Sequence, residues 1–244
     1  MRALTHCLTL IALVLFVGNI DVMQGASATT SFPTDPKEHS SFSGDLVSAL
    51  TYIGQTFDVS IVAEVAQPYP TQLRLPAGKH TAEELLTLLV QQAAGYAWQK
   101  QGSVAWVYNQ EVAHSTGDFL NLHRTAVRMP GNLGELRLQL PMEVSVAEGH
   151  GGGVGTGVVP REHEEFHLSP ETLANPTIRD VLFRAATEVK LLSVIVFPNS
   201  SPTPSDQDEA FSNWYLVPNE LLSSQPLHVR SLPAKHNFGP SHLP

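Results

Sequence analysis

Cysteine, basic charge and long apolar runs are all scarce in this sequence. Cys7 is the only cysteine, so a disulfide or a cysteine nucleophile is excluded from the rest of the chain, and stability must come from a hydrophobic core. Lys and Arg number 14 against 23 Asp and Glu, which gives a formal net charge of -9. This acidic balance argues against nucleic acid or an anionic membrane surface as the main partner.

The one marked apolar run lies at the N-terminus. Residues 8–17 are apolar except for Thr9, follow the positively charged Arg2, and precede Ala26-Ser27-Ala28, which has the A-x-A form of a cleavage signal. This three-part layout predicts a secretory signal peptide over residues 1–28, cleaved near Ala28. The run is shorter than the about 20 apolar residues of a spanning helix, and no later stretch reaches that length. We therefore expect a periplasmic or secreted product without a transmembrane segment.

Composition divides the remainder of the chain into four parts. Residues 29–41 are polar with two prolines and are interpreted as a linker, whereas the Pro- and Ser-rich residues 219–244 are interpreted as a flexible tail. Between them we expect a first module at 42–110 and a second at 118–218, with the Gly-rich segment 149–157 as a loop. That loop lacks the strand–helix setting and the lysine of a phosphate-binding loop.

Hydrophobic periodicity predicts helices and strands in the first module. A helix is expected to begin just after Ser43, and VSIVAE (59–64) is expected to form a strand that ends at an exposed Glu64. A second strand, TQLRL, is followed by a helix that starts with a Thr81–Glu84 capping box. Two alternating runs around Gln-Gly then predict a hairpin over residues 96–108.

The second module is expected to repeat part of this order. Thr177 and Asp180 have capping-box spacing before a helix over 178–189, and strands are expected at 191–197 and 211–218. Further strands are predicted at 119–129, at 133–146 and at 166–168. The chain is thus predicted to be α+β, and its second half is either a degenerate copy of the first or a separate α/β or α+β unit.

Several pieces of the first module match a family pattern. They are Ala49-Leu50 with Ile53, residues 59–62, residues 73–75, residues 81–89 and Gly95-Tyr96. Together they resemble the STN module, the short domain at the N-terminus of secretins and of some TonB-dependent receptors, with β-α-β-β-α-β-β order. The resemblance covers residues 42–110 and implies a periplasmic protein-interaction module. It implies as partner a secretin, a TonB-dependent receptor or a membrane regulator, and it implies no cofactor.

HEEFH at 163–167 matches the H-E-x-x-H signature of zinc peptidases. In that class His163 and His167 would bind zinc from one helix, Glu164 would act as the base, and a third ligand such as His150 would be needed. Prolines at 160 and 170 leave barely two turns for such a helix, so a solvated polar segment is the preferred interpretation and no metal is expected.

The paired aromatics of the predicted hairpin offer another candidate site. Trp98 and Trp106 could line a face that binds a small ligand or a glycan, although core or cross-strand packing is the preferred interpretation. The sequence as a whole favours a non-catalytic, exported envelope protein that binds a protein partner by a sheet edge or a helix face. A small zinc peptidase and a ligand- or glycan-binding module are the alternatives.

Overall fold

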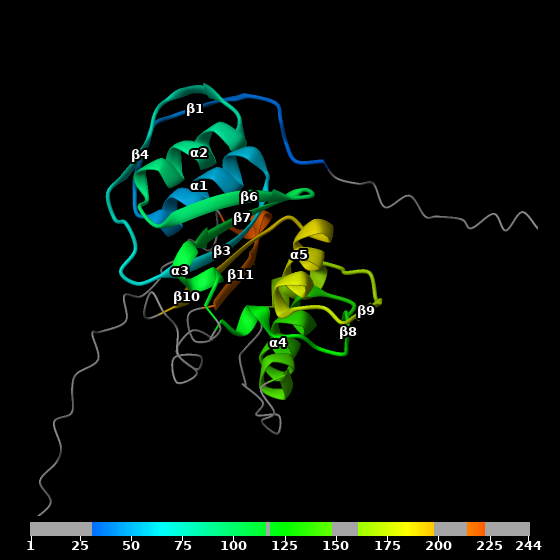
Figure 1. The fold of residues 1–244 in the computed structure, drawn as a ribbon. Coiled ribbons are helices and arrows are strands. Elements are labelled where there is room, and N and C mark those ends of the chain that lie inside the picture. Colours follow the sequence, from blue (N-terminus) through cyan, green and yellow to red (C-terminus); the bar gives the residue numbers. More distant parts are fainter. Residues whose placement is uncertain (1–30, 116–117, 148–160, 198–213, 223–244) are drawn as a thin grey trace, which may run out of the picture.

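The computed structural model describes residues 31–115, 118–147, 161–197 and 214–222, which form a mixed α+β fold as predicted (Figure 1). In chain order the elements are β1 (Lys37–His39), β2 (Phe42–Gly44), α1 (Leu46–Phe57), β3 (Ser60–Ala66), β4 (Leu73–Leu75), β5 (Gly78–His80), α2 (Ala82–Gln92), β6 (Tyr96–Gln101), β7 (Val104–Asn109), α3 (Gln110–Ala113), the 3-10 helix η1 (Phe119–Asn121), β8 (Ala126–Arg128), α4 (Leu133–Ala147), the 3-10 helix η2 (Arg161–Glu165), β9 (Thr172–Ala174), α5 (Ile178–Glu188), β10 (Leu191–Phe197), β11 (Trp214–Pro218) and the 3-10 helix η4 (Asn219–Leu221).

The two halves of the chain share one five-stranded sheet of order β11-β10-β3-β7-β6. The central strand β3 is parallel to β7 on one side and to β10, from the second half, on the other. The outer strands β6 and β11 are antiparallel to their neighbours. All seven residues of both β3 and β10 are buried, which explains their near-continuous apolar sequences. The expected second module therefore has its main strands inside the sheet of the first.

Helices cover both faces of this sheet (Figure 1). α1 and α2 pack on one face, with Ile61, Ala63 and Val65 of β3 in the same hydrophobic cluster. α4 and α5 form a second cluster on the opposite face with Val62 and Ala66. Because side chains alternate along a strand, Glu64 also points toward the α5 side.

Capping groups fix the starts of the main helices. Asp45 accepts from the Ser48 amide at 2.7 Å and caps α1, two residues after the predicted position at Ser43. The expected Thr81–Glu84 box is present at α2. The same reciprocal bonds join Thr177 to Asp180 at α5, so both capping predictions are confirmed.

The order of elements around α4 parallels that around α1. β2 pairs with β4, and α1 and β3 lie between these two strands in the sequence. In the same way β8 pairs with β9, with α4 and η2 between them in the sequence. Each short ladder is followed by a capped helix and two strands. Within the described part of the second half, no strand between α4 and β9 corresponds to β3, and β10 instead pairs with β3 itself.

The strand predicted over 133–146 is wrong, because this segment forms α4. Asn132 Oδ1 accepts from the Glu135 amide at 2.8 Å at the start of the helix. The buried side chains of α4 recur at helical spacing; they are Leu133, Leu136, Leu140 and Val144. Leu136, Leu138 and Leu140 alternate as in a strand, but the longer set fits one helical stripe, and Leu138 is exposed.

Other expected boundaries also need correction. The linker assigned to 29–41 contains β1, which pairs with β5, and Phe32, which is buried against the sheet. The tail assigned from 219 begins with η4, where Asn219 Nδ2 donates to Gly54 O and Val59 O. Only residues 126–128 of the strand expected at 119–129 form one, and β9 replaces the strand expected at 166–168. The predicted signal peptide, the Gly-rich loop and residues 223–244 lie outside the described residues.

Among the residues that the structure describes, none of the helices has the length and apolar character to cross a bilayer.

The shared sheet predicts that the first half cannot fold alone. A chain of residues 31–114 would expose the β10-facing edge of β3 and the apolar side chains that α4 and α5 cover. We expect it to aggregate, or to unfold without a cooperative transition, whereas residues 31–222 unfold cooperatively. Size-exclusion chromatography and thermal circular dichroism distinguish the two. A monodisperse 31–114 chain with a sharp transition would show instead that the first half is autonomous.

Candidate functional site

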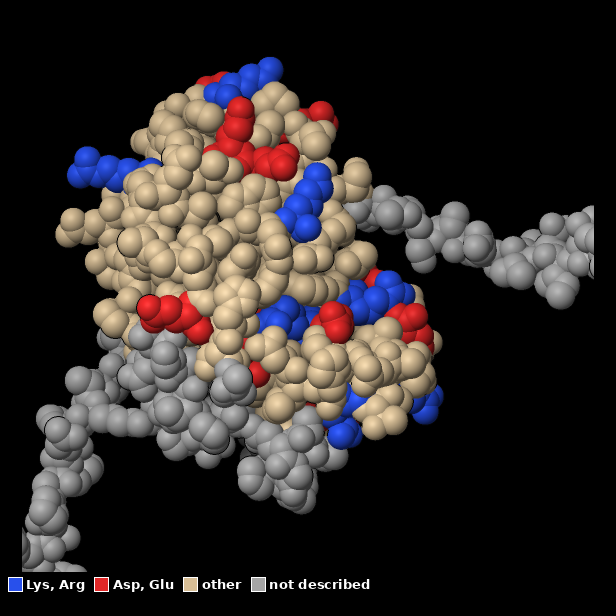
Figure 2. Space-filling view, viewed as in Figure 1, with Lys and Arg blue, Asp and Glu red and all other residues tan. Residues whose placement is uncertain are grey.

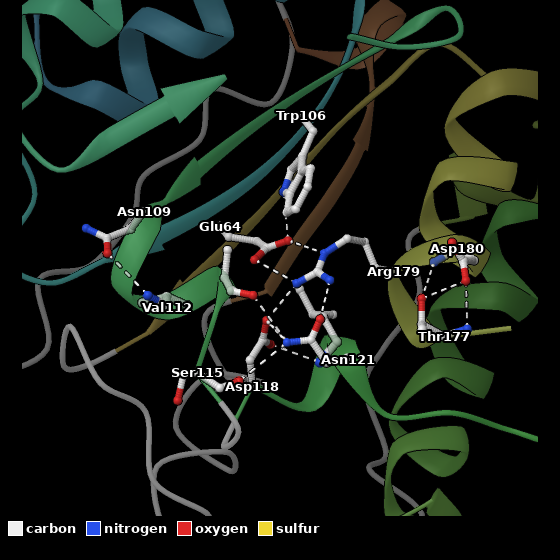
Figure 3. Close-up of polar contacts among 12 residues, drawn as sticks. Glu64, Trp106, Asn109, Val112, Ser115, Asp118, Asn121, Thr177, Arg179 and Asp180 are labelled. Atoms are coloured by element: carbon white, nitrogen blue, oxygen red, sulfur yellow. Dashed lines mark hydrogen bonds and ion pairs between the residues drawn. The ribbon is translucent and has the colours of Figure 1, made fainter. Parts of the chain in front are cut away.

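A cluster of buried charges lies where the two halves meet (Figure 3). Arg179 of α5 makes two hydrogen bonds to Glu64 of β3, from Nε to Oε1 at 2.7 Å and from Nη2 to Oε2 at 3.1 Å. Its Nη2 also donates to Oδ2 of Asp118 at 2.7 Å. Glu64 is 0% exposed and Asp118 is 1% exposed, so both carboxylates have left water entirely. The single guanidinium therefore serves two buried carboxylates.

Neutral side chains complete this cluster. Trp106 Nε1 donates to Glu64 Oε1 at 2.8 Å, and the Arg179 guanidinium carbon lies 4.7 Å from the Trp106 ring centroid, a cation–π contact. Arg179 Nη1 donates to Asn121 Oδ1, and Asn121 Nδ2 in turn donates to Asp118 Oδ2 at 3.3 Å. The buried guanidinium thus donates from three of its nitrogens, as a desolvated cation requires.

Three separate segments position these groups. Arg179 is the second residue of α5, and the Thr177–Asp180 box determines where that helix begins. Asp118 caps η1 by accepting from the Leu120 amide at 2.9 Å. Glu64 is held by the parallel pairing of β3 with both β7 and β10. The cluster therefore connects the central strand to two elements of the second half.

The environment of the buried Asp118 carboxyl raises its pKa to about 7. Burial is the largest cause, and repulsion from Glu64 adds to it, while the guanidinium of Arg179 acts in the opposite direction. For Arg179, burial acts to lower the pKa, but the bonds to Glu64 and the charge of Asp118 outweigh it and the pKa is raised. The cation stays charged, and the Asp118 carboxyl releases its proton only near neutral pH.

Among the described residues the cluster is buried in the interior. Two surface hollows lined by described residues contain none of Glu64, Asp118 and Arg179. A buried acid with a raised pKa is typical of catalytic sites, but a reacting group must also touch a bound molecule. The geometry therefore fits a polar joint that fixes α5 and η1 on the sheet.

The prediction that Glu64 is the exposed end of its strand is wrong. β3 continues to Ala66, and Glu64 lies inside a run of buried residues. An acid within a strand of this kind must find a cation, and that requirement was a usable signal in the sequence. Arg179 lies 115 residues away, so the signal did not identify the partner.

Trp98 and Trp106 do not share a face, so the predicted ligand face is not formed. Trp98 pairs with Val107 and Gln99 pairs with Trp106, which places the two indoles on opposite sides of the sheet. The hairpin turns at Gly102-Ser103, not at Gln-Gly. A two-residue turn at either place sets Trp98 and Trp106 on opposite faces, so the error lay in assigning the two side chains to one face. Trp106 lies against Arg179 and Phe183, while Trp98 lies beside α2.

The HEEFH segment does not have the geometry of a zinc peptidase. His163 and Glu164 lie in the short 3-10 helix η2, which ends at Glu165, and His167 follows it in a bridge with Asn132. His163 is buried, whereas Glu164 and His167 are exposed. The third candidate ligand, His150, lies outside the described residues. No group of three or more potential metal ligands occurs within the part of the chain that the structure describes.

A second feature is the open outer edge of β6. The sequence predicted a sheet edge or a helix face as the binding surface, but it did not identify the strand. The pairs Gln101–Val104, Gln99–Trp106 and Ala97–Tyr108 are expected to carry the ladder hydrogen bonds, since the loop between the strands has two residues. The backbone N–H and C=O groups of Trp98 and Lys100 then point away from β7. No other described strand pairs with this edge.

Comparisons with models of known protein families, with characterised proteins and with solved structures found no match to this chain.

Replacing Arg179 by Met should be strongly destabilising, since it leaves two carboxylates buried without a cation. We expect a loss of about 3–5 kcal/mol in the free energy of unfolding. Arg184→Met, on the same helix, removes ion pairs that are partly exposed and should cost about 0–1 kcal/mol. Chemical denaturation of both variants measures the difference, and equal losses would contradict the role assigned to Arg179.

The raised pKa of Asp118 predicts how stability depends on pH. The ordinary pKa of 3.8 rises to about 7 on folding, so between these values the folded chain holds a proton that the unfolded chain has released. This group therefore lowers stability as pH rises from about 4 to 7. Asp118→Asn keeps an acceptor for Arg179 and leaves one carboxylate for one guanidinium. Chemical denaturation at several pH values should show that the free energy of unfolding of the variant increases relative to that of the wild type as pH rises. A difference that does not change with pH would contradict the raised pKa.

Proposed function

We propose that this chain is a non-catalytic protein-interaction module of the bacterial envelope, and that it binds its partner by strand addition at the outer edge of β6. The observation that carries the proposal is the one-sided pairing of this strand. An incoming strand would find the N–H and C=O groups of Trp98 and Lys100 already oriented for a further ladder.

The other edge of the sheet is less suited to this task. β11 has five residues and ends at Pro218, which has no N–H to donate. β6 has six residues and no proline, and most of its side chains are half-buried or exposed. Strand addition at β6 would also leave the buried charge cluster undisturbed, because Glu64 and Arg179 lie inside the sheet and under α5.

Two sequence observations support the envelope setting. The signal-like residues 1–28 imply export, and the resemblance of residues 42–110 to STN modules implies contacts between envelope proteins. By that resemblance the partner is a secretin, a TonB-dependent receptor or a membrane regulator. The zinc-peptidase and ligand-face alternatives lose their support, since η2 is not an α-helix of HExxH type and the two tryptophans are separated.

Lys100→Pro tests the proposal against Lys100→Ala. Both variants remove the side chain that lies over Phe32, but only proline also removes the outward N–H. Because that N–H is not part of the β6–β7 ladder, both variants should melt within a few degrees of each other. The measurement is a crosslinked pull-down of the tagged chain from envelope extract. We expect Lys100→Ala to recover the partner and Lys100→Pro to recover about tenfold less of it.

Equal recovery by the two variants would contradict strand addition at β6. Equal loss by both would assign the contact to the lysine side chain, which also contradicts a backbone ladder. The mass-spectrometric identity of a partner that only Lys100→Pro loses then names the system that the protein serves.

A further inference from the structure

A groove runs beside the open edge of β6, between that strand and α2. It has a volume of about 690 Å³ and is lined by His80, Thr81, Glu83, Glu84, Thr87, Leu88 and Trp98. Trp98 Nε1 donates to Thr87 Oγ1 at 3.2 Å, so the indole bridges the strand and the helix at the base of the groove. The indole also stacks with Phe32, at 6.2 Å between ring centroids.

The lining of the groove combines acidic side chains with apolar ones. Glu83 and Glu84 are in the first turn of α2, and Figure 2 shows acidic side chains gathered over the start of that helix. The pKa of Glu84 is lowered, first by its bond from the Thr81 amide, and the carboxylate therefore stays ionised. Leu88 and Trp98 supply the apolar surface.

We propose that the occupant of this groove is an extended, basic segment of a partner protein, with Lys or Arg at every second position. This inference rests on the proposed function, since it requires the segment to pair with β6. A strand added there would lie about 4.8 Å beyond β6, and alternate side chains would point toward α2. Their aliphatic stems would cover Trp98 and Leu88, and their charged ends would reach Glu83 and Glu84.

Charge complementarity distinguishes this occupant from two others. A second copy of this chain would bring another acidic surface to the groove, because the chain carries a net charge of -9. An acidic or neutral strand could make the same backbone bonds but would gain nothing from the glutamates. The backbone ladder thus gives affinity, and the acids of α2 give selectivity.

The test uses two synthetic peptides, acetyl-TKVKVKVT-amide and its counterpart with glutamate in place of lysine. Each is titrated into ¹⁵N-labelled protein of residues 29–244, and the shifts of the Trp98 and Lys100 amides and of the Trp98 indole N–H are followed. We expect the lysine peptide to move these signals and to bind about tenfold more tightly at low salt, with a smaller ratio at high salt.

Glu83→Gln/Glu84→Gln is the informative variant, because Gln still completes a capping box while the two charges are lost. It should bind both peptides with equal affinity. The control, Glu111→Gln/Glu220→Gln, makes the same change in net charge outside the groove and should keep the tenfold preference.

Each remaining outcome overturns a stated part of the account. Equal shifts of the β6 signals by both peptides would overturn the basic occupant and leave strand addition standing. Binding of the lysine peptide without shifts at β6, or no binding, would overturn the groove as its site, and the Lys100→Pro comparison then decides the proposed function separately. A dimer with protected Trp98 and Lys100 amides before any peptide is added would replace the proposal by self-association.

Discussion

The carboxylate of Glu64 lies in the middle of a strand that is buried on both faces and paired on both edges. Such a charge is tolerated only when a cation and further hydrogen-bond donors meet it in the interior. Here Arg179 and Trp106 supply them, and Arg179 reaches the site because the capping box at Thr177 begins α5 at the right place. The buried ion pair therefore fixes the position of α5 on the sheet, beside the hydrophobic cluster that α4 and α5 form there.

The same arrangement leaves only the outer strands of the sheet available for contacts. β3 and β10 are enclosed, β11 ends in proline, and among the described strands of the sheet β6 combines length with outward-facing backbone groups. The groove between β6 and α2 lies at that edge. The buried cluster fixes α5 on the sheet, whereas the outer edge of β6 has no partner among the described strands.

Local sequence signals predicted much of this fold. The capping boxes at Thr81 and Thr177, the strand LLSVIVF and the helix after Thr81 each follow from a few adjacent residues. The failures are long-range, or arise where a short run fits two patterns. Residues 136–140 fit a strand and a helix equally, and only the burial of Leu133 and Val144 decides between them. The tryptophans were placed on one face although any two-residue turn near Gly102 separates them, so that error came from not working out the pairing along the hairpin.

The candidate sites were harder to predict than the fold. HEEFH drew attention because it matches a short motif, yet its backbone is not that of the motif. The cluster of Glu64, Asp118 and Arg179 has no motif, since its members come from three distant segments. The open edge of β6 depends on the strand order of the complete sheet, which no local pattern contains.

Residue-resolved amide hydrogen exchange on the free protein tests the central claim most directly. The account predicts slow exchange for the amide of Gln99, which faces β7, and fast exchange for the neighbouring amides of Trp98 and Lys100, which face outward. Equal protection of all three amides in the monomer would mean that the outer edge of β6 is already paired, and would contradict a strand that is free to accept a partner.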